Sequence, residues 1–211
     1  IAGHEVVSDI HFGDWGMPVA LIIAFTEKNN INIEELRFND FENIYPKAAS
    51  LSKEDTDFYE KSKNISKKLN DKDKFYISEW KKIYNIVIPE IKDLLKLTNH
   101  EFDFYLGESD VVNNIDIVLD KAIKEKKIKK DEGAYISTEK TDPPILITKS
   151  DGSNLYLTTD LGTVHYRENK FKIDKYIYVV DQRQQKHFEQ LFSTCKHFEL
   201  SKKYFEHVGF G

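Results

Sequence analysis

A run of apolar residues that leads at once into an amphipathic helix is the feature that most restricts the fold of this chain. Residues 176–180 read YIYVV, a continuous apolar segment typical of a strand buried in a parallel sheet. Asp181 ends the segment, and a helical period of three and four residues follows it. A strand joined directly to a helix is the repeating unit of an α/β sheet. The apolar face of this predicted helix carries Phe188, Leu191, Phe192, Cys195 and Phe198.

The N-terminal part of the chain has the same order of elements. Residues 5–10 (EVVSDI) predict a short strand, and the FGDWG segment after it predicts a turn that opens a helix reaching Glu27. We therefore expect an α/β fold with a Rossmann-like, doubly wound parallel sheet formed by parts at about 1–30 and 145–211. A mostly helical insertion at about 31–144 interrupts it.

The insertion is dense in charge, and its apolar residues recur at helical spacing. Pro89 lies inside the longest such pattern, so a kink or two separate helices are expected there. These stripes are more typical of a core than of a ligand site. One stripe consists of Tyr76, Trp80, Tyr84, Val87 or Ile88, Ile91 and Leu94 or Leu95, and a second consists of Val111, Ile115, Val118 and Ala122.

The period changes after residue 134. Three short segments predict strands, at residues 135–136, 145–147 and 155–157. Asp151-Gly152 is a hairpin signal between the last two strands. Thr158 and Thr159 are suited to cap a helix that starts near Asp160.

Bulk properties exclude several classes of protein. The 211 residues are 40% hydrophobic and 32% charged, which is typical of a soluble globular protein. No apolar run approaches the roughly 20 residues of a membrane-spanning helix, and the first residues do not resemble a signal peptide. The single cysteine, Cys195, fits a reducing compartment, so a cytoplasmic location is expected.

The net charge of −5 limits nucleic-acid binding to a local basic patch or to other parts of a larger protein. The densest basic run, KEKKIKK at residues 124–130, is predicted to be the solvated end of a helix. Contact with a tRNA backbone is the alternative. The seven histidines show no metal-binding spacing, so no protein-bound metal site is expected.

Residues 149–167, KSDGSNLYLTTDLGTVHYR, are the most informative segment for function. Tyr156 and Asp160 are four residues apart where a strand is predicted to meet a helix. A carboxylate and a phenol at this position can face one pocket and receive a guanidinium, whose five N–H donors form a fixed fork. The alternative is that Asp160 only caps its helix.

Gly13, Asp14, Trp15 and Gly16 lie between a predicted strand and helix, where open parallel sheets bind their ligands. A helix-entry turn with a packing tryptophan would give the same pattern. No Walker A sequence, GxGxxG or GxSxG motif is present.

The segment KSDG…Y-x-T-x-D-L resembles an element of the arginyl-tRNA synthetases, which are class I aminoacyl-tRNA ligases. GDWG, FYLGES at residues 104–109 and HVGFG at residues 207–211 are similar to further landmarks of that family, in the same order. The resemblance covers nearly the whole chain and identifies it with the interior of a class I catalytic domain.

The resemblance also implies roles for individual residues. Ser109 of the GES element would end a strand and cap the next helix, His4 would be structural, and His187 would be a helix-face residue rather than a catalyst. The unusual pair Gln182-Arg183 departs from the family pattern, which leaves the roles of neighbouring residues open. The implied arginine-binding residues are Tyr156, Asp160 and Gln184, and the implied nucleotide-binding residues are Gly13, Asp14, Trp15, Gly16, His207, Val208 and Gly209.

The implied reaction joins L-arginine and ATP to give arginyl-adenylate and then transfers the arginine to tRNA. ATP with Mg²⁺ would be the co-substrate, and tRNA is generally needed for the first step in this family. Gly3-His4 matches a pair downstream of the first class I signature, and the KMSKS-type loop is missing too. The 211 residues alone are therefore expected to be inactive.

Two other functions agree with parts of the sequence. A non-catalytic module that binds an amino acid, a nucleotide or a partner protein would need neither signature. A class I synthetase of another specificity is a further alternative, but Asp160 argues against it because a neutral side-chain substrate gains nothing from a carboxylate.

Overall fold

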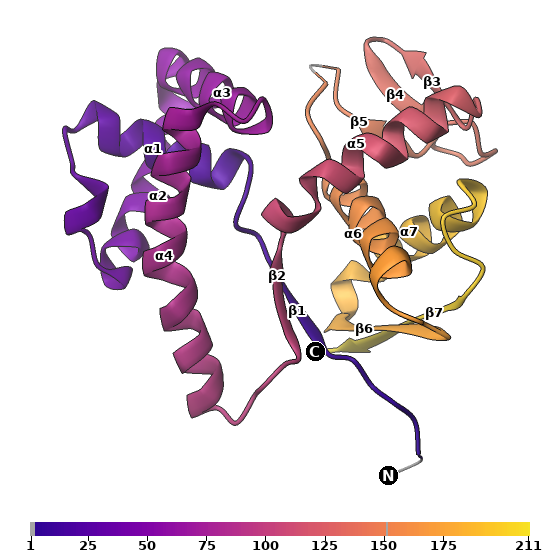
Figure 1. The fold of residues 1–211 in the computed structure, drawn as a ribbon. Coiled ribbons are helices and arrows are strands. Elements are labelled where there is room, and N and C mark those ends of the chain that lie inside the picture. The colour runs from indigo at the N-terminus through magenta and orange to yellow at the C-terminus, as the bar shows by residue number, and fades with distance from the viewer. Residues whose placement is uncertain (1–2, 151) are drawn as a thin grey trace. The chain divides into compact units, whose positions relative to one another are not determined.

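The computed structural model describes residues 3–150 and 152–211 and shows a mixed α/β protein (Figure 1). The chain divides into two compact units, Ile1–Ser109 and Asp110–Gly211. Each unit contains one pair of parallel strands, and the second also contains a small antiparallel sheet. None of the helices in the described residues has both the length and the apolar character needed to cross a bilayer.

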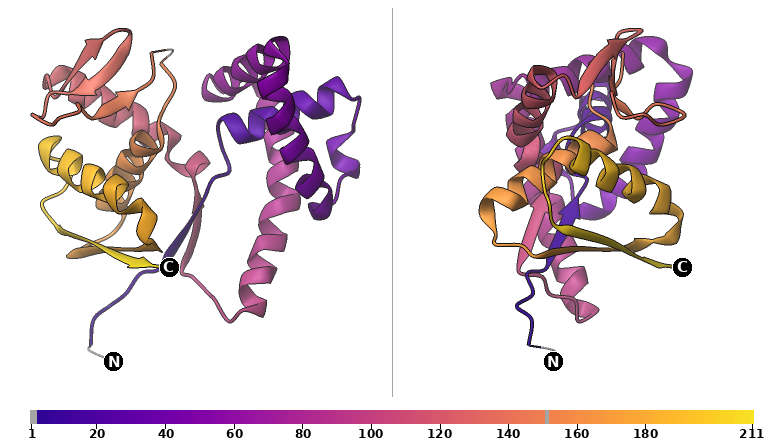
Figure 2. Two further views of the ribbon diagram at one scale, coloured as in Figure 1. Left: turned by 180° about the vertical axis from the view of Figure 1, so that it is seen from behind. Right: turned by 90° about the vertical axis from the view of Figure 1, so that its right-hand side faces the viewer.

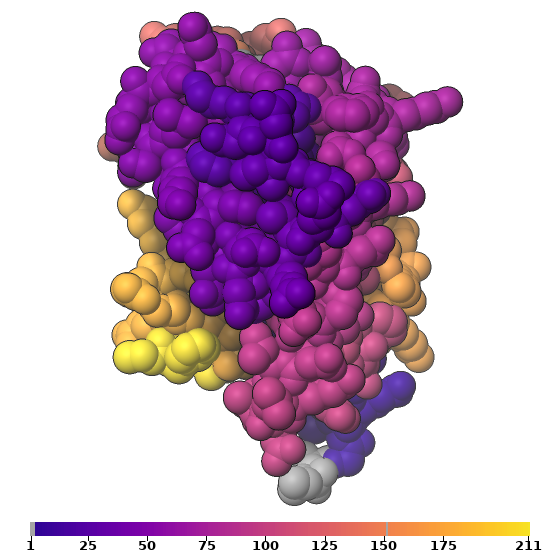
Figure 3. All heavy atoms as spheres, turned by 90° about the vertical axis from the view of Figure 1, so that its left-hand side faces the viewer, coloured from indigo at the N-terminus to yellow at the C-terminus, as the bar shows by residue number. Residues whose placement is uncertain are grey.

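The first unit is a parallel strand pair joined by a block of helices. Strand β1 (Asp9–Phe12) lies beside β2 (Phe104–Gly107), with Asp9 opposite Phe104 and Phe12 opposite Gly107. Apolar side chains of the helices form one core, and Figure 3 shows one face of this block as closely packed indigo to magenta atoms. The helices are α1 (Met17–Lys28), η1 (Ile33–Glu35), α2 (Phe38–Glu54), α3 (Thr56–Asn70) and α4 (Lys74–Leu97).

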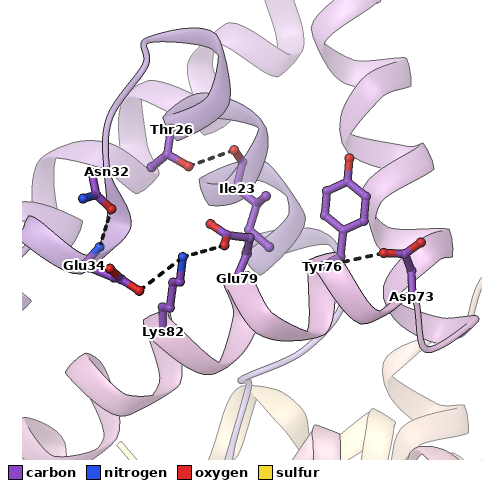
Figure 4. Close-up of polar contacts among 8 residues, drawn as sticks. All are labelled: Ile23, Thr26, Asn32, Glu34, Asp73, Tyr76, Glu79 and Lys82. Atoms are coloured by element: carbon purple, nitrogen blue, oxygen red, sulfur yellow. Dashed lines mark hydrogen bonds and ion pairs between the residues drawn. The ribbon is translucent and has the colours of Figure 1, made fainter.

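Carboxylates at helix starts and one lysine make several of the polar contacts of this block. Asp55 caps α3 by accepting the Phe58 N–H at 2.9 Å, and Asp73 caps α4 by accepting the N–H of Tyr76 at 3.3 Å. Lys82 joins two elements, because its Nζ lies 2.8 Å from Glu79 of α4 and 3.4 Å from Glu34 of η1 (Figure 4).

Pro89 does not divide α4. A kink or two separate helices were expected at this proline, and the second alternative is wrong, since one helix runs from Lys74 to Leu97. A proline in a helix removes a single backbone hydrogen bond, and the buried side chains of Ile83 and Ile88 anchor the part of the helix that precedes the proline.

The second unit packs three helices with two sheets. Figures 1 and 2 show α6 and α7 side by side near the parallel pair β6–β7. The predicted faces are confirmed: Val111, Ile115, Val118 and Ala122 are buried on α5, as are four of the five apolar residues of α7, with Phe192 partly buried. The elements are α5 (Glu108–Lys124), β3 (Ile128–Asp131), β4 (Ala134–Ser137), β5 (Leu146–Thr148), α6 (Tyr156–Lys170), β6 (Lys175–Asp181), η2 (Gln182–Gln184), α7 (Gln185–His197) and β7 (Tyr204–Phe210).

The segment before Asp160 differs from the prediction. Residues 155–157 do not form a strand, because α6 already begins at Tyr156. Thr158 lies inside the first turn, where its hydroxyl accepts the Leu155 N–H at 3.2 Å and donates to the Ile147 carbonyl. It therefore stabilises the helix start from within instead of preceding it. Asp151 of the predicted hairpin turn lies outside the described residues.

Two strand boundaries and the lysine run also differ. Strand β1 begins at Asp9, so residues 5–8 are not part of it. The run at 124–130 is not only a helix end, since α5 stops at Lys124 and β3 starts at Ile128. Lys127, between the two elements, forms an ion pair with Glu199 at 2.9 Å.

Strand β6 is parallel as predicted, but it is not buried on both faces within the described residues. In residues 3–150 and 152–211 its only partner strand is β7, and its side chains alternate between the core and the surface. Ile177 is 56% exposed and Val179 is 62% exposed, whereas Tyr176 is buried. The parallel pairs β1–β2 and β6–β7 belong to separate two-stranded sheets in the described part of the chain.

Candidate functional site

The start of α6 presents the two residues that the sequence singled out. Tyr156 and Asp160 are separated by four residues on a continuous helix, so they lie one above the other on the same face. The phenol is half exposed, and Asp160 is buried. The pair therefore combines an accessible ring with a carboxylate that is largely withdrawn from water.

His187 completes this group from α7. Its Nε2 lies 2.6 Å from Asp160 Oδ2, and its ring centroid lies 4.5 Å from that of Tyr156. The sequence predicted a helix-face residue, and His187 does lie on a helix, but its contact with Asp160 was not foreseen. The spacing of three residues between Gln184 and His187, which puts both at one helix start, was the available signal.

The carboxylate of Asp160 acts on two neighbours in the core of the unit. Burial raises the pKa of the Cys195 thiol, and the negative charge of Asp160 raises it further. Burial also raises the pKa of the Tyr178 phenol. The positive charge of Arg167 lowers this pKa, and the negative charge of Asp160 raises it. Both groups therefore stay neutral at pH 7, and Cys195 has the character of a structural residue rather than a nucleophile.

Gln184 ends the short helix η2 and is half-buried. Within the described residues its side-chain amide has no hydrogen-bond partner. The neighbouring Arg183 contacts the Asp181 carboxylate, with its Nε 2.9 Å from Oδ1 and its Nη2 2.6 Å from Oδ2. Asp181 also accepts the Arg183 N–H at 2.8 Å, so this pair fixes the turn after β6.

A hollow of about 370 Å³ lies where η2, α7 and β7 meet. His207 Nε2 is buried without a hydrogen-bond partner in the described residues, and the His207 ring stacks on Phe188 with centroids 5.0 Å apart. Val208 points to the opposite face of β7, where it pairs with Val179. The hollow is lined by Gln182, Gln185, Glu189, Phe192, His207 and Gly209.

The GDWG turn lies in the first unit, and its polar groups have partners there. Asp14 accepts hydrogen bonds from the Ser109 N–H at 3.1 Å and from the Ser109 hydroxyl at 2.6 Å. Ser109 was predicted to cap α5 itself; instead it lies inside the first turn and donates to Asp14. Trp15 donates to Asn70 at 2.9 Å and packs edge-on against Trp80, with ring centroids 5.2 Å apart.

The remaining groups of the turn are its two glycines. Gly16 has a φ of 78°, which an L side chain rarely adopts, and Gly13 has no neighbour within 4 Å of an added Cβ. In residues 3–150 and 152–211, no three His, Cys, Asp or Glu side chains come together in a way that could hold a metal ion.

Comparison with known proteins gives a consistent result. The family model described as tRNA synthetases class I (R), catalytic domain, matches residues 1–211. The arginine–tRNA ligase of Alkaliphilus oremlandii is 32% identical over 214 residues, which cover 92% of this chain and 36% of that protein. The enzyme of the same name from Chromobacterium violaceum is 29% identical, with 99% of this chain and 39% of that protein covered. The chain thus spans less than two fifths of the length of these relatives.

Solved structures agree with these matches. The arginyl-tRNA synthetase of Plasmodium falciparum superposes with a TM-score of 0.79 at 26% identity, covering 97% of this chain and 36% of that one. A structure from Campylobacter jejuni, titled a putative arginyl-tRNA synthetase, gives a TM-score of 0.62 at 14% identity, covering 98% of this chain and 46% of that one. The second likeness shows the fold alone.

Proposed function

The chain belongs to the family of class I arginyl-tRNA synthetase catalytic domains, and from this premise we propose that it forms the amino-acid-binding part of an arginine–tRNA ligase. The parent protein would join L-arginine to ATP as arginyl-adenylate and then transfer the arginine to tRNA. The observation that carries the proposal is the buried carboxylate of Asp160 beside the phenol of Tyr156 on the first two turns of α6.

Asp160 supplies the charge that this substrate requires. The Oδ2 atom of this carboxylate contacts His187 Nε2. The other oxygen, Oδ1, has no hydrogen-bond partner in the described residues. A guanidinium placed there would exchange its water for a charge-assisted pair in a site of low dielectric. The exposed face of Tyr156 would hold the plane of the group, and the amide of Gln184 would bind the polar end of the amino acid.

The hollow beside β7 is the proposed site of the nucleotide. His207 Nε2 is a buried polar atom without a partner in the described residues, so a ligand that offers it a hydrogen bond would remove an energetic cost. Gly209 allows η2 to lie close to β7 at the wall of the hollow, because an added Cβ would lie only 3.1 Å from Gln182 Cα. Val208 would contribute through its backbone only, since its side chain faces away from the hollow.

The GDWG turn has a narrower proposed role. Gly13 and Gly16 leave backbone open to a nucleotide, which supports a contact there. The side chains of Asp14 and Trp15 are held by Ser109 and Asn70, which supports a role in fixing the turn rather than touching the ligand.

Magnesium would arrive with ATP, since Mg²⁺ in such sites binds substrate phosphates and keeps several of its waters. A Rossmann-like, doubly wound arrangement belongs to the same proposal, supported by the two parallel strand pairs that are each joined to helices.

The buried, unreactive Cys195 agrees with a reducing compartment such as the cytoplasm.

A thermal-shift titration with arginine and citrulline tests the proposal. Citrulline has nearly the shape of arginine but carries no charge, so a pocket built on Asp160 should be stabilised by arginine alone. Asp160→Asn preserves the size of the side chain and should abolish the shift. Equal shifts with both ligands, or a shift that survives in Asp160→Asn, would contradict a guanidinium site at Asp160.

A further inference from the structure

We infer that His187 is a positioning residue that holds the Asp160 carboxylate in the orientation in which it receives the guanidinium. This inference rests on the proposed function and deepens it, because it explains how a single carboxylate on α6 can present a fixed geometry. The role acts through Asp160, and His187 itself need not touch the substrate.

The contact joins two separate helices. Asp160 lies in the second turn of α6 and His187 in the first turn of α7, 27 residues later, with Nε2 and Oδ2 2.6 Å apart. An aspartate side chain that bonds nothing can rotate about its two torsions and presents its oxygens in many directions. A donor fixed on another element selects one of these orientations.

The imidazole ring is itself held in place. Its side chain is only 18% exposed, and its ring contacts two aromatic rings, with centroid distances of 4.5 Å to Tyr156 and 5.1 Å to Phe188. An ionised carboxylate only accepts hydrogen bonds, so Nε2 must carry the hydrogen in this contact. His187 is therefore a restrained donor aimed at one oxygen of Asp160.

The bond leaves the carboxylate able to bind a second cationic group. Two carboxylate oxygens offer about four lone-pair sites, and His187 uses one of them. Oδ1 and the second lone pair of Oδ2 stay available for the parallel N–H bonds of a guanidinium fork. Because a fork needs both oxygens in one plane, an error in the carboxylate angle weakens arginine binding more than it would weaken the binding of a point charge.

Two substitutions separate the positioning role from simple packing. In His187→Gln the side-chain amide nitrogen can occupy the place of Nε2 and donate to Asp160, whereas His187→Leu retains bulk but has no donor. Calorimetric titration of the intact protein with arginine and citrulline at pH 7.5 gives the two affinities. The glutamine variant should bind arginine within about threefold of wild type, and the leucine variant about tenfold or more weakly, as expected for the loss of a hydrogen bond to a charged group. The preference for arginine over citrulline should fall with the affinity.

Each other outcome has a defined meaning. Wild-type affinity in His187→Leu, or a glutamine variant as weak as the leucine variant, would overturn the positioning role while leaving the proposed function intact. A folded wild-type protein that does not bind arginine would overturn the proposed function and this inference together. If circular dichroism shows that His187→Leu is unfolded, His187→Asn replaces it. Its shorter amide does not reach Oδ2, so the same loss is expected, and full affinity would overturn the role.

Discussion

His165 is a residue whose surroundings favour its neutral form. Its Nδ1 lies 3.0 Å from Asn114 Oδ1, and Asn169 Nδ2 lies 3.3 Å from its Nε2. A neutral ring with its hydrogen on Nδ1 satisfies both contacts as donor and acceptor. Burial, followed by the positive charge of Lys121, lowers the pKa of His165 below the ordinary value of 6.5.

This lowered pKa makes stability depend on pH. Below pH 6.5 the unfolded chain binds a proton at His165, whereas His165 in the folded protein stays neutral until the pH approaches its lower pKa. The contribution of His165 to the unfolding free energy is therefore lost as the pH falls from 6.5 towards the pKa of the folded state. Urea unfolding at pH 7.5 and 5.5 should show a smaller loss on acidification in His165→Gln than in wild type. The same loss in both proteins would show that His165 does not contribute.

A second residue-scale test concerns Gly107. A Cβ added there would lie 2.3 Å from Asp14 Oδ1, so Gly107→Ala must displace the carboxylate from Ser109. Losing these bonds in a half-buried place should lower the unfolding free energy by about 1–3 kcal/mol. Gly13→Ala is the matched control, because nothing lies within 4 Å of its Cβ.

The cause of the loss can be checked in the same denaturant experiment. On an Asp14→Ala background no carboxylate remains to be displaced, so Gly107→Ala should cost clearly less than in wild type. An equal cost on both backgrounds would mean that the effect comes from strand β2 itself rather than from Asp14.

Among the elements, α5 and α6 approach closely at Gly162. A Cβ there would lie 2.7 Å from Ile115 Cγ1 and 3.1 Å from the Ile115 backbone nitrogen. Alanine in place of glycine normally stabilises a helix interior by about 1 kcal/mol. The steric clash with Ile115 should outweigh this gain in helix propensity. Gly162→Ala should therefore destabilise the protein by about 1–3 kcal/mol, as overpacked core positions do. A gain in stability in chemical unfolding would refute this packing.

The elements also show what local sequence can and cannot determine. The helix faces of α5 and α7 were predicted because burial on one face imposes a period of three to four residues. Residues 155–157 were wrongly assigned to a strand, because a run of only three apolar residues occurs at a helix start as readily as in a strand. The contact that decides the matter joins Thr158 to Ile147, and no local pattern contains it. For the same reason the sequence could suggest Tyr156 and Asp160 as a pair four residues apart, whereas the contact of Asp160 with His187 on another helix lay outside any local pattern.

At the scale of the whole molecule, each unit has its own hydrophobic core. Both tryptophans, Trp15 and Trp80, pack against the core of the first unit, so tryptophan fluorescence reports on that unit. Leu69 is fully buried there, and Leu69→Ala should cost about 2–5 kcal/mol in the fluorescence-detected transition. Leu97 is 83% exposed in the same unit, and Leu97→Ala should change the free energy of unfolding by less than about 0.5 kcal/mol. Similar effects of the two substitutions would contradict this core.

The central claim is that the charge of Asp160 selects the charge of the ligand, and a calorimetric cycle measures this directly. Arginine and citrulline are titrated into wild type and into Asp160→Asn, which gives four affinities. Wild type should prefer arginine by about a hundredfold or more, as a site built for one polar group does, and the preference should nearly vanish in Asp160→Asn. A preference for arginine that persists undiminished in Asp160→Asn would contradict the account, because the guanidinium would then be recognised elsewhere.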